Sequence, residues 1–226
     1  MVNPILNHFS KNVDDYDTVA DKVVMKNNEL HDCLISSIPF GLDKKFKVLD
    51  LGCGTGHGMS LILKKFKNAK VTGVDFSKRM ILKSKENIKE FLERINLIEE
   101  DFNKMRFNEN YDVVISAIAI HNSNHNQKRD LFKKIFNCLN DGGFFINGDF
   151  VEGESIDIDK KYKQVYKNFL ETNLEGVELD VWLRHAFKED MPMALSQQIG
   201  ALKKEGFKDI KKLWQFNNEV IYISKK

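Results

Sequence analysis

Residues 46–58 read Phe-Lys-Val-Leu-Asp-Leu-Gly-Cys-Gly-Thr-Gly-His-Gly, and the architecture of the chain follows from them. The mostly apolar residues 46–51 predict a buried strand, and glycines then alternate from 52 to 58. Glycine accepts positive φ and lets the backbone approach a ligand closely. A helix expected from about Met59 to Phe66 adds free amides at its N-terminus. Because open α/β sheets bind ligands beyond the carboxyl ends of their strands, this turn is expected to bind one.

The spacing of the glycines narrows the classes of ligand that this turn can bind. A dinucleotide fingerprint, G-x-G-x-x-G, needs glycine where His57 or Met59 stands, and no G-K-[ST] follows for a P-loop. The next predicted strand, residues 69–75, ends in Asp75, whose carboxylate can accept hydrogen bonds from ribose hydroxyls. These features favour a nucleoside ligand and disfavour a pyrophosphate.

Apolar runs and helical patterns alternate along the chain. The expected strands are residues 46–51, 69–75, 95–98, 111–119, 144–150, 207–214 and 219–224, and the expected helices are 59–66, 77–94, 131–139 and 195–204. Residues 121–127 are expected to form a loop, and residues 154–190 a helical insertion over the strand ends. The alternation predicts a parallel α/β sheet with right-handed crossovers, and the last two strands a hairpin that adds one antiparallel strand.

Composition excludes several other classes. The 226 residues carry a formal net charge of +2, which is nearly balanced, and 42% are hydrophobic. No apolar run approaches the roughly 20 residues of a membrane span, and no secretory signal is expected. The three cysteines, Cys33, Cys53 and Cys138, are far apart and match no disulfide or zinc framework, so a reducing, cytoplasmic setting is expected.

Five motifs, in order, resemble those of the class I S-adenosylmethionine-dependent methyltransferases. They are Val48-Leu-Asp-Leu-Gly-Cys-Gly-Thr-Gly56, Val71-Thr-Gly-Val-Asp-Phe-Ser77, Glu100-Asp-Phe102, Tyr111-Asp-Val-Val-Ile-Ser-Ala117 and Leu139-Asn-Asp-Gly-Gly-Phe-Phe145. Further stretches, Ala117–His121, Lys128–Lys134 and Met191–Ile199, resemble small bacterial and archaeal members of unassigned substrate. The resemblance implies a seven-stranded, mostly parallel sheet with helices on both faces. It implies one domain, with an N-terminal helical lid (1–43), a cofactor-binding core (44–150), a helical insertion (151–192) and a C-terminal helix and hairpin (193–226).

The resemblance also implies roles for individual residues in binding S-adenosylmethionine. Those expected to hold its methionine part are Asp50, Gly52, Cys53, Gly54, Thr55 and Gly56. Asp75 is expected to bind the ribose, Phe76 and Met80 to flank the adenine, and Asp101 to accept from its amino group beside Phe102. Ser116, Ala117 and Ile118 are expected to pass under the sulfonium.

The acceptor of the methyl group is expected to be a small molecule. The Asn/Asp-Pro-Pro-Tyr/Phe signature of common amino-methylating groups is absent after the fourth strand, and so is a cysteine nucleophile. His121 is the candidate general base, because it follows that strand and histidine titrates near neutrality. The candidate acceptor-binding residues are Tyr16, His121, Trp182, Arg184 and His185.

Other functions stay open. RNA is an alternative acceptor, which a contiguous basic face around Lys64, Lys65, Lys67 and Lys70 would favour. A carboxy-S-adenosylmethionine synthase would share the scaffold without transferring a methyl group, and Arg184 would then face the sulfonium substituent. A non-enzymatic S-adenosylmethionine-binding module is a further alternative. The sequence demands no metal, although a metal-dependent O-methylating site stays open. The expected oligomeric state is a monomer or a homodimer.

Overall fold

A computed structural model describes residue 13 and residues 16–226, and its centre is a mixed β-sheet. The strands are β1 (Phe46–Leu51), β2 (Ala69–Asp75), β3 (Ile95–Glu99), β4 (Tyr111–Ala117), β5 (Leu139–Phe150), β6 (Lys208–Phe216) and β7 (Glu219–Lys225). Their order is β3-β2-β1-β4-β5-β7-β6. Strand β7 runs antiparallel to both of its neighbours, β5 and β6, and the other described strands share one direction. The predicted sheet, with its one antiparallel strand, is therefore confirmed.

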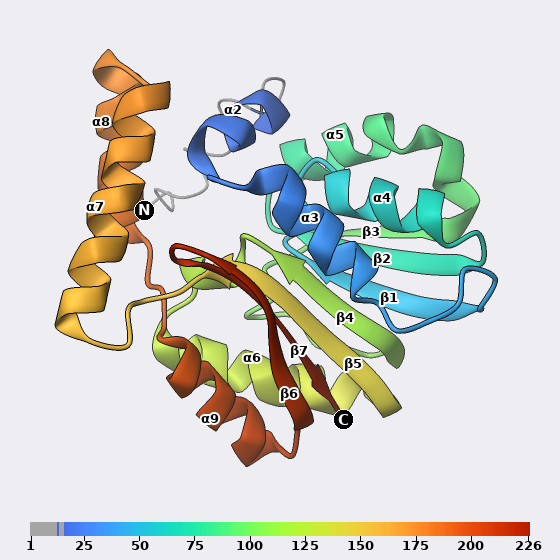
Figure 1. Ribbon diagram of the computed structural model, residues 1–226. Helices are drawn as coiled ribbons and strands as arrows, with labels where there is room; N and C mark the ends of the chain where they lie inside the picture. The colour runs from blue at the N-terminus through green and yellow to red at the C-terminus, as the bar shows by residue number, and fades with distance from the viewer. Residues whose placement is uncertain (1–12, 14–15) are drawn as a thin grey trace.

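Helices cover both faces of the sheet (Figure 1). The helices are α2 (Tyr16–Val23), α3 (Asn27–Ser36), α4 (His57–Lys65), α5 (Lys78–Asn87), α6 (His125–Cys138), α7 (Ile156–Asn173), α8 (Gly176–Arg184) and α9 (Leu195–Glu205). Two 3-10 turns, η1 (Lys89–Arg94) and η2 (Ile120–Asn122), and one π-helical turn, η3 (His185–Glu189), complete the described elements. Helices α3, α4 and α5 lie on one face, and α6 and α9 lie on the other (Figure 1).

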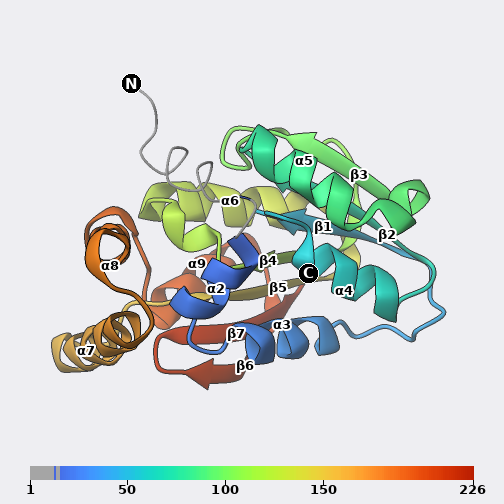
Figure 2. The ribbon, with the colours of Figure 1, turned by 90° about the horizontal axis from the view of Figure 1, so that it is seen from above.

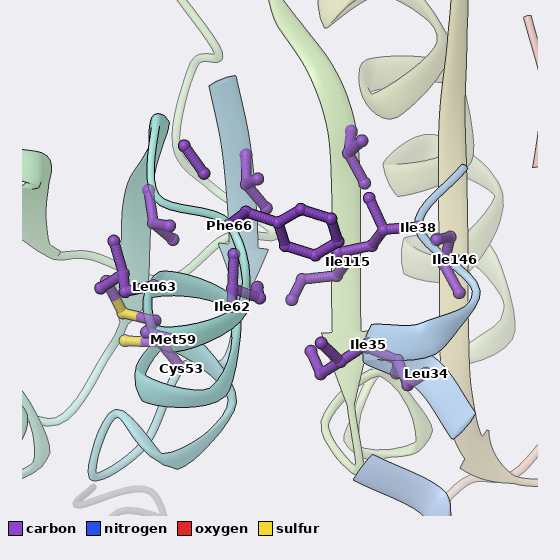
Figure 3. Close-up of a cluster of buried hydrophobic side chains, with 14 of the residues drawn as sticks. Leu34, Ile35, Ile38, Cys53, Met59, Ile62, Leu63, Phe66, Ile115 and Ile146 are labelled. Atoms are coloured by element: carbon purple, nitrogen blue, oxygen red, sulfur yellow. The ribbon is translucent and has the colours of Figure 1, made fainter. Parts of the chain in front are cut away.

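Successive side chains along each strand point to opposite faces of the sheet and so form two hydrophobic cores. Val113 and Ile115 of β4 face the core under α3 and α4, whereas Val114 between them faces the core under α6 and α9. Figure 3 shows the first core, where Ile35 of α3 and Ile62 of α4 approach Ile115 from neighbouring helices. Since both faces are buried at the centre of the sheet, the central strands β1 and β4 are mostly apolar, as the sequence indicated.

Some boundaries differ from those expected. The segment 121–127 is not all loop, because α6 begins at His125 behind a capping box between Asn124 and Gln127. That helix ends at Cys138, and the Asp-Gly-Gly segment expected to close it lies inside β5. Strand β4 ends at Ala117, two residues early, because Ile118 has a φ of 51°.

The insertion of α7, α8 and η3 packs beside α2 (Figure 2). Val19 and Val23 of α2 share a buried cluster with Leu170 and Trp182, and the Tyr166 hydroxyl donates to the carbonyl oxygen of Val23 at 2.9 Å. The insertion therefore supports α2 from behind. Among the described residues, every helix is either too short or too polar to span a lipid bilayer.

Candidate functional site

A cavity of about 680 Å³ lies at the carboxyl ends of the central strands. The glycine turn after β1, the end of β2 and the residues after β4 form its inner wall, and α2 and α3 contribute the outer wall. This is the location at which open α/β sheets bind ligands.

The glycine turn presents its backbone to this cavity. Gly52 and Gly54 have φ values of 78° and 51° and line the wall. A Cβ on Gly52 would lie 2.4 Å from Cβ of Ala119, whereas a Cβ on Gly54 would meet nothing nearer than Tyr16 Cε1 at 4.0 Å. Gly54 thus leaves space for a ligand, and Gly52 allows two chain segments to pack closely.

Gly56 does not line the cavity, contrary to the expectation that it contacts the ligand. It precedes α4 with a φ of 86°, and a Cβ there would lie 2.5 Å from Ser84 Oγ. Its role is therefore to let α4 and α5 approach each other. Cys53 and Thr55, the other turn residues, do line the wall, and Thr55 donates to Asp17 Oδ1 at 2.6 Å.

Two buried carboxylates face the turn. Asp75 Oδ2 accepts from the amide of Gly54 at 3.0 Å, and its Oδ1 accepts from the amide of Ser77 at 2.8 Å. Burial raises the pKa of Asp75 to about 6, and these two hydrogen bonds oppose that rise. Burial also raises the pKa of Asp50 to about 7, and the neighbouring Asp75 carboxylate adds to the effect. Each carboxylate oxygen has a second lone pair with which to bind a ligand hydroxyl or ammonium.

An apolar recess with one carboxylate continues the wall. Phe76, Met80 and Phe102 line it, and Met80 and Phe102 are largely buried. Asp101 lies beside them, accepts from the amide of Asn103 at 2.9 Å, and forms an ion pair of 3.4 Å with Lys104. Apolar faces with one acceptor suit a purine that carries an amino group.

The end of β4 closes the bottom of the cavity. Ala117 and Ile118 line it, and the positive φ of the β-branched Ile118 is a strained conformation of the kind found at functional sites. Ser116 does not line it, because its hydroxyl is buried and donates to the carbonyl oxygen of Leu51 at 2.9 Å. The Ser116 hydroxyl therefore links β4 to β1, and the expectation that Ser116 passes under the sulfonium has no support from the cavity lining.

His121 is not on the cavity wall. Its ring is buried, with Nδ1 2.6 Å from Asp149 Oδ1 and Nε2 3.7 Å from Asp190 Oδ1. Burial lowers the pKa of His121, but the charges of Asp149 and Asp190 outweigh burial and the net shift is upward. A buried histidine held between two carboxylates stabilises the fold and does not reach the cavity. The expectation that His121 is the general base is therefore not supported. The next residues, Asn122 and Ser123, line the cavity instead.

The three candidates from the insertion are also off the wall. Trp182 packs in the cluster behind α2, and the Arg184 side chain is 65% exposed with Nε 3.3 Å from Glu189 Oε1. His185 is buried, with Nε2 3.3 Å from Asp190 Oδ1. The insertion packs against α2, and α2 separates the insertion from the cavity that it lines.

The outer wall contains residues that the sequence did not single out. Tyr16, which was expected, lies there, and burial raises its pKa, helped by the charges of Asp75 and Asp17. The additional polar residues are Asp17, Asp21, Asn27, Asn28 and His31. The four-residue spacing of Asp17 and Asp21, and of Asn27 and His31, marks one face of each helix and was the available signal.

The donors of this cavity fit S-adenosylmethionine. The amides of the turn residues Gly52, Cys53, Gly54 and Gly56 already donate within the fold. The two buried carboxylates suit the ammonium group and ribose hydroxyls of this cofactor, and the apolar recess beside Asp101 suits its adenine. The space that a side chain on Gly54 would occupy is left for that ligand.

Comparisons with known proteins agree with this fit. Residues 48–143 match the family model described as methyltransferase domain. The chain is 30% identical over 214 residues to the carboxy-S-adenosyl-L-methionine synthase of Staphylococcus epidermidis, covering 92% of this chain and 90% of the relative. It is also 30% identical over 129 residues to a malonyl-[acyl-carrier protein] O-methyltransferase of Priestia megaterium, covering 56% of this chain and 45% of that protein.

A solved structure, an O-methyltransferase family protein from Burkholderia thailandensis, shares the fold with a TM-score of 0.70 at 13% identity. It aligns over 97% of this chain and 61% of the other. The chain therefore belongs to the class I S-adenosylmethionine-dependent methyltransferase family, and its cofactor is S-adenosylmethionine.

Proposed function

We propose that this protein transfers the methyl group of S-adenosylmethionine to a small molecule that bears an amine. S-adenosylmethionine supplies an electrophilic methyl carbon when bound, and the chain's residues bind, orient and accept a proton. Within this proposal Asp50, Asp75 and Asp101 serve the cofactor, and the wall from α2 and α3 serves the acceptor.

The charge of the wall is the observation that carries this proposal. The acceptor side presents the carboxylates of Asp17 and Asp21. Among the residues that the structure describes, the wall has no arginine, and its lysine, Lys104, is paired with Asp101. Carboxylates attract a cationic or polarised amine and repel an anionic acceptor.

His31 is the residue best placed to accept the proton that the amine releases. It lines the cavity from α3, and its Nδ1 lies 2.9 Å from the carbonyl oxygen of Asn27. Because that carbonyl only accepts, Nδ1 carries the proton and Nε2 carries the lone pair. Burial lowers the pKa of His31, so the ring is neutral at pH 7 and can act as a base.

Synthesis of carboxy-S-adenosylmethionine is the second candidate, favoured by the extent of the match to the Staphylococcus epidermidis protein. An added carboxylate beside the sulfonium needs a cation to hold it. The residue expected to do so, Arg184, is ion-paired with Glu189 outside the cavity. The charge of the described wall therefore favours methyl transfer over this alternative.

An RNA acceptor is not favoured by the position of the basic residues. Lys64 and Lys65 end α4, and Lys67 and Lys70 surround the start of β2. That is the amino end of the strands, whereas the cavity lies at their carboxyl ends.

The test combines mass spectrometry with an acceptor screen. The ligand released from denatured, purified protein is identified, and S-adenosylhomocysteine formation is then measured with panels of amines, alcohols and carboxylic acids. We expect S-adenosylmethionine or S-adenosylhomocysteine as the released ligand and turnover with amines. Release of a cofactor heavier by one carboxyl group, without turnover by any acceptor, would refute the proposal.

A pair of variants tests the acceptor side. Asp17→Asn removes a wall carboxylate, so KM for the amine should rise while cofactor affinity changes little. Asp157→Asn removes an equivalent charge from the exposed first turn of α7 and should change neither. If both variants behave alike, the wall charge does not select the acceptor.

A further inference from the structure

Three buried donor atoms converge behind the cavity wall. His121 Nε2 lies 3.7 Å from Asp190 Oδ1, and His185 Nε2 lies 3.3 Å from the same oxygen. The donor atoms of these three residues all lie within 4.8 Å of one another. They come from η2 after β4 and from the turn that ends the insertion, so segments distant in the sequence supply them.

Two of their three spacings are close to those of ligands around one ion, and the third lies within 4.8 Å. Zinc bound by histidine and carboxylate has bonds of about 2.0–2.1 Å, which places tetrahedral neighbours about 3.4 Å apart. The two distances to Asp190 Oδ1 fall on either side of that value. Rotation of the two imidazole rings to the same mutual spacing would bring all three atoms to bonding distance of one ion.

The ring nitrogen of each histidine that faces away from Asp190 contacts a second carboxylate, which orients the ring. His121 Nδ1 lies 2.6 Å from Asp149 Oδ1, and His185 Nδ1 lies 3.2 Å from Glu189 Oε2. Metal-binding histidines usually have this second contact, because it fixes the tautomer and directs a lone pair on the opposite nitrogen toward the ion. In both residues that opposite nitrogen is the one that approaches Asp190.

The local backbone brings the donors together. Residues His185–Glu189 form a π-helical turn, in which the amide of Asp190 donates to the carbonyl oxygen of His185 at 3.0 Å. This wider turn aligns positions five residues apart, and single π turns are often found at functional sites. Oδ1 of Asp190 is buried and has no hydrogen-bond donor among the described residues, which leaves a carboxylate oxygen aimed at two imidazoles.

We propose that His121, His185 and Asp190 bind a divalent transition-metal ion of the zinc class. Imidazole and carboxylate are donors that such ions accept, and three protein ligands leave a fourth position for water. The ion would replace the 3.1 Å contact between Asn122 Nδ2 and His121 Nε2. Its effect would be to fasten the end of the insertion to the strand ends of β4 and β5, behind the helix that lines the cavity.

The neighbouring charges are compatible with a divalent ion. Asp149 and Glu189 add two carboxylates beside the ligand Asp190. Two cations lie nearby, because Lys128 Nζ donates to main-chain carbonyls, including that of Met191 at 2.6 Å, and Arg184 pairs with Glu189, so three carboxylates face two cations. The cluster thus keeps negative charge with which to balance the ion.

The test measures zinc on the full chain, purified with a tag that lacks histidine. The protein is treated with a chelator, saturated with Zn²⁺, desalted and examined by elemental analysis. We expect one zinc per wild-type chain and a loss of at least tenfold in His185→Ala. His125→Ala is the matched control, because this half-buried histidine in α6 lies outside the cluster and should retain the ion.

Two further measurements keep the proposal testable if His185→Ala does not fold. Cobalt substituted into the wild type should give the visible absorption of a low-coordinate nitrogen and oxygen site. Glu189→Gln should keep the fold and weaken zinc affinity by roughly 10- to 100-fold, as for the loss of an outer partner. Folded wild type that retains no zinc, or a His185→Ala variant that retains as much as the wild type, would overturn the proposal.

Discussion

Replacing the first glycine of the turn separates two physical costs that a sequence pattern cannot distinguish. Gly52 and Gly54 both have positive φ, so alanine at either position is strained by roughly 1–2 kcal/mol. At Gly52 the new methyl group would also lie 2.4 Å from Cβ of Ala119, and overpacking adds about 1–3 kcal/mol. We therefore expect Gly52→Ala to destabilise the protein by about 2–5 kcal/mol and Gly54→Ala by about 1–2 kcal/mol.

Urea and thermal unfolding measure these changes. In a chain of this size 1 kcal/mol corresponds to a midpoint shift of roughly 2–4 °C. Adding Ala119→Gly to Gly52→Ala removes the opposing methyl group, so the double variant should recover about 1–3 kcal/mol, whereas the same change added to Gly54→Ala should recover nothing. Purely additive effects in the first pair would refute the close approach of the two segments.

The remaining predictions concern titration and the histidines. S-adenosylhomocysteine should bind best above pH 7, because protons compete with the ligand for Asp50 and Asp75, whose pKa values are raised to about 7 and 6. The affinity should fall about tenfold from pH 7 to 6 and about 50-fold from pH 6 to 5, where both carboxylates take up protons; calorimetric affinity that is flat over this range would contradict their roles. His31→Ala should lower kcat and leave cofactor affinity nearly unchanged, measured by turnover and calorimetry; equal losses in both would mean that this ring only supports the fold. His121→Ala should lower the free energy of unfolding by about 3–5 kcal/mol, because it removes the imidazole partner of the buried Asp149 carboxylate and leaves it with amide donors alone; urea unfolding that matches the wild type would contradict the buried pair.

The sequence was sufficient where local pattern and backbone chemistry set the outcome. Strands β1 and β2 have the expected bounds, because apolar runs that end in glycine or aspartate leave few other conformations. The inner wall of the cavity consists largely of the motif residues, because the glycine turn and the strand ends bring them together through local structure. Gly56 and Ser116 were exceptions, and each faces a packing neighbour that the pattern does not specify.

Tertiary structure alone decided which polar side chains reach the cavity. His121 follows β4 as expected, yet it turns away from the cavity because Asp149 on the neighbouring strand and Asp190 at the end of the insertion hold its ring. His31 reaches the wall because one face of α3 lines the cavity, and its four-residue spacing from Asn27 marks that face without showing what the face covers. Secondary structure and backbone turns follow from neighbouring residues, and the sequence by itself determined them together with the cofactor class. The burial and pairing of a titratable side chain depend on segments far apart in the chain, so only the folded structure determined them.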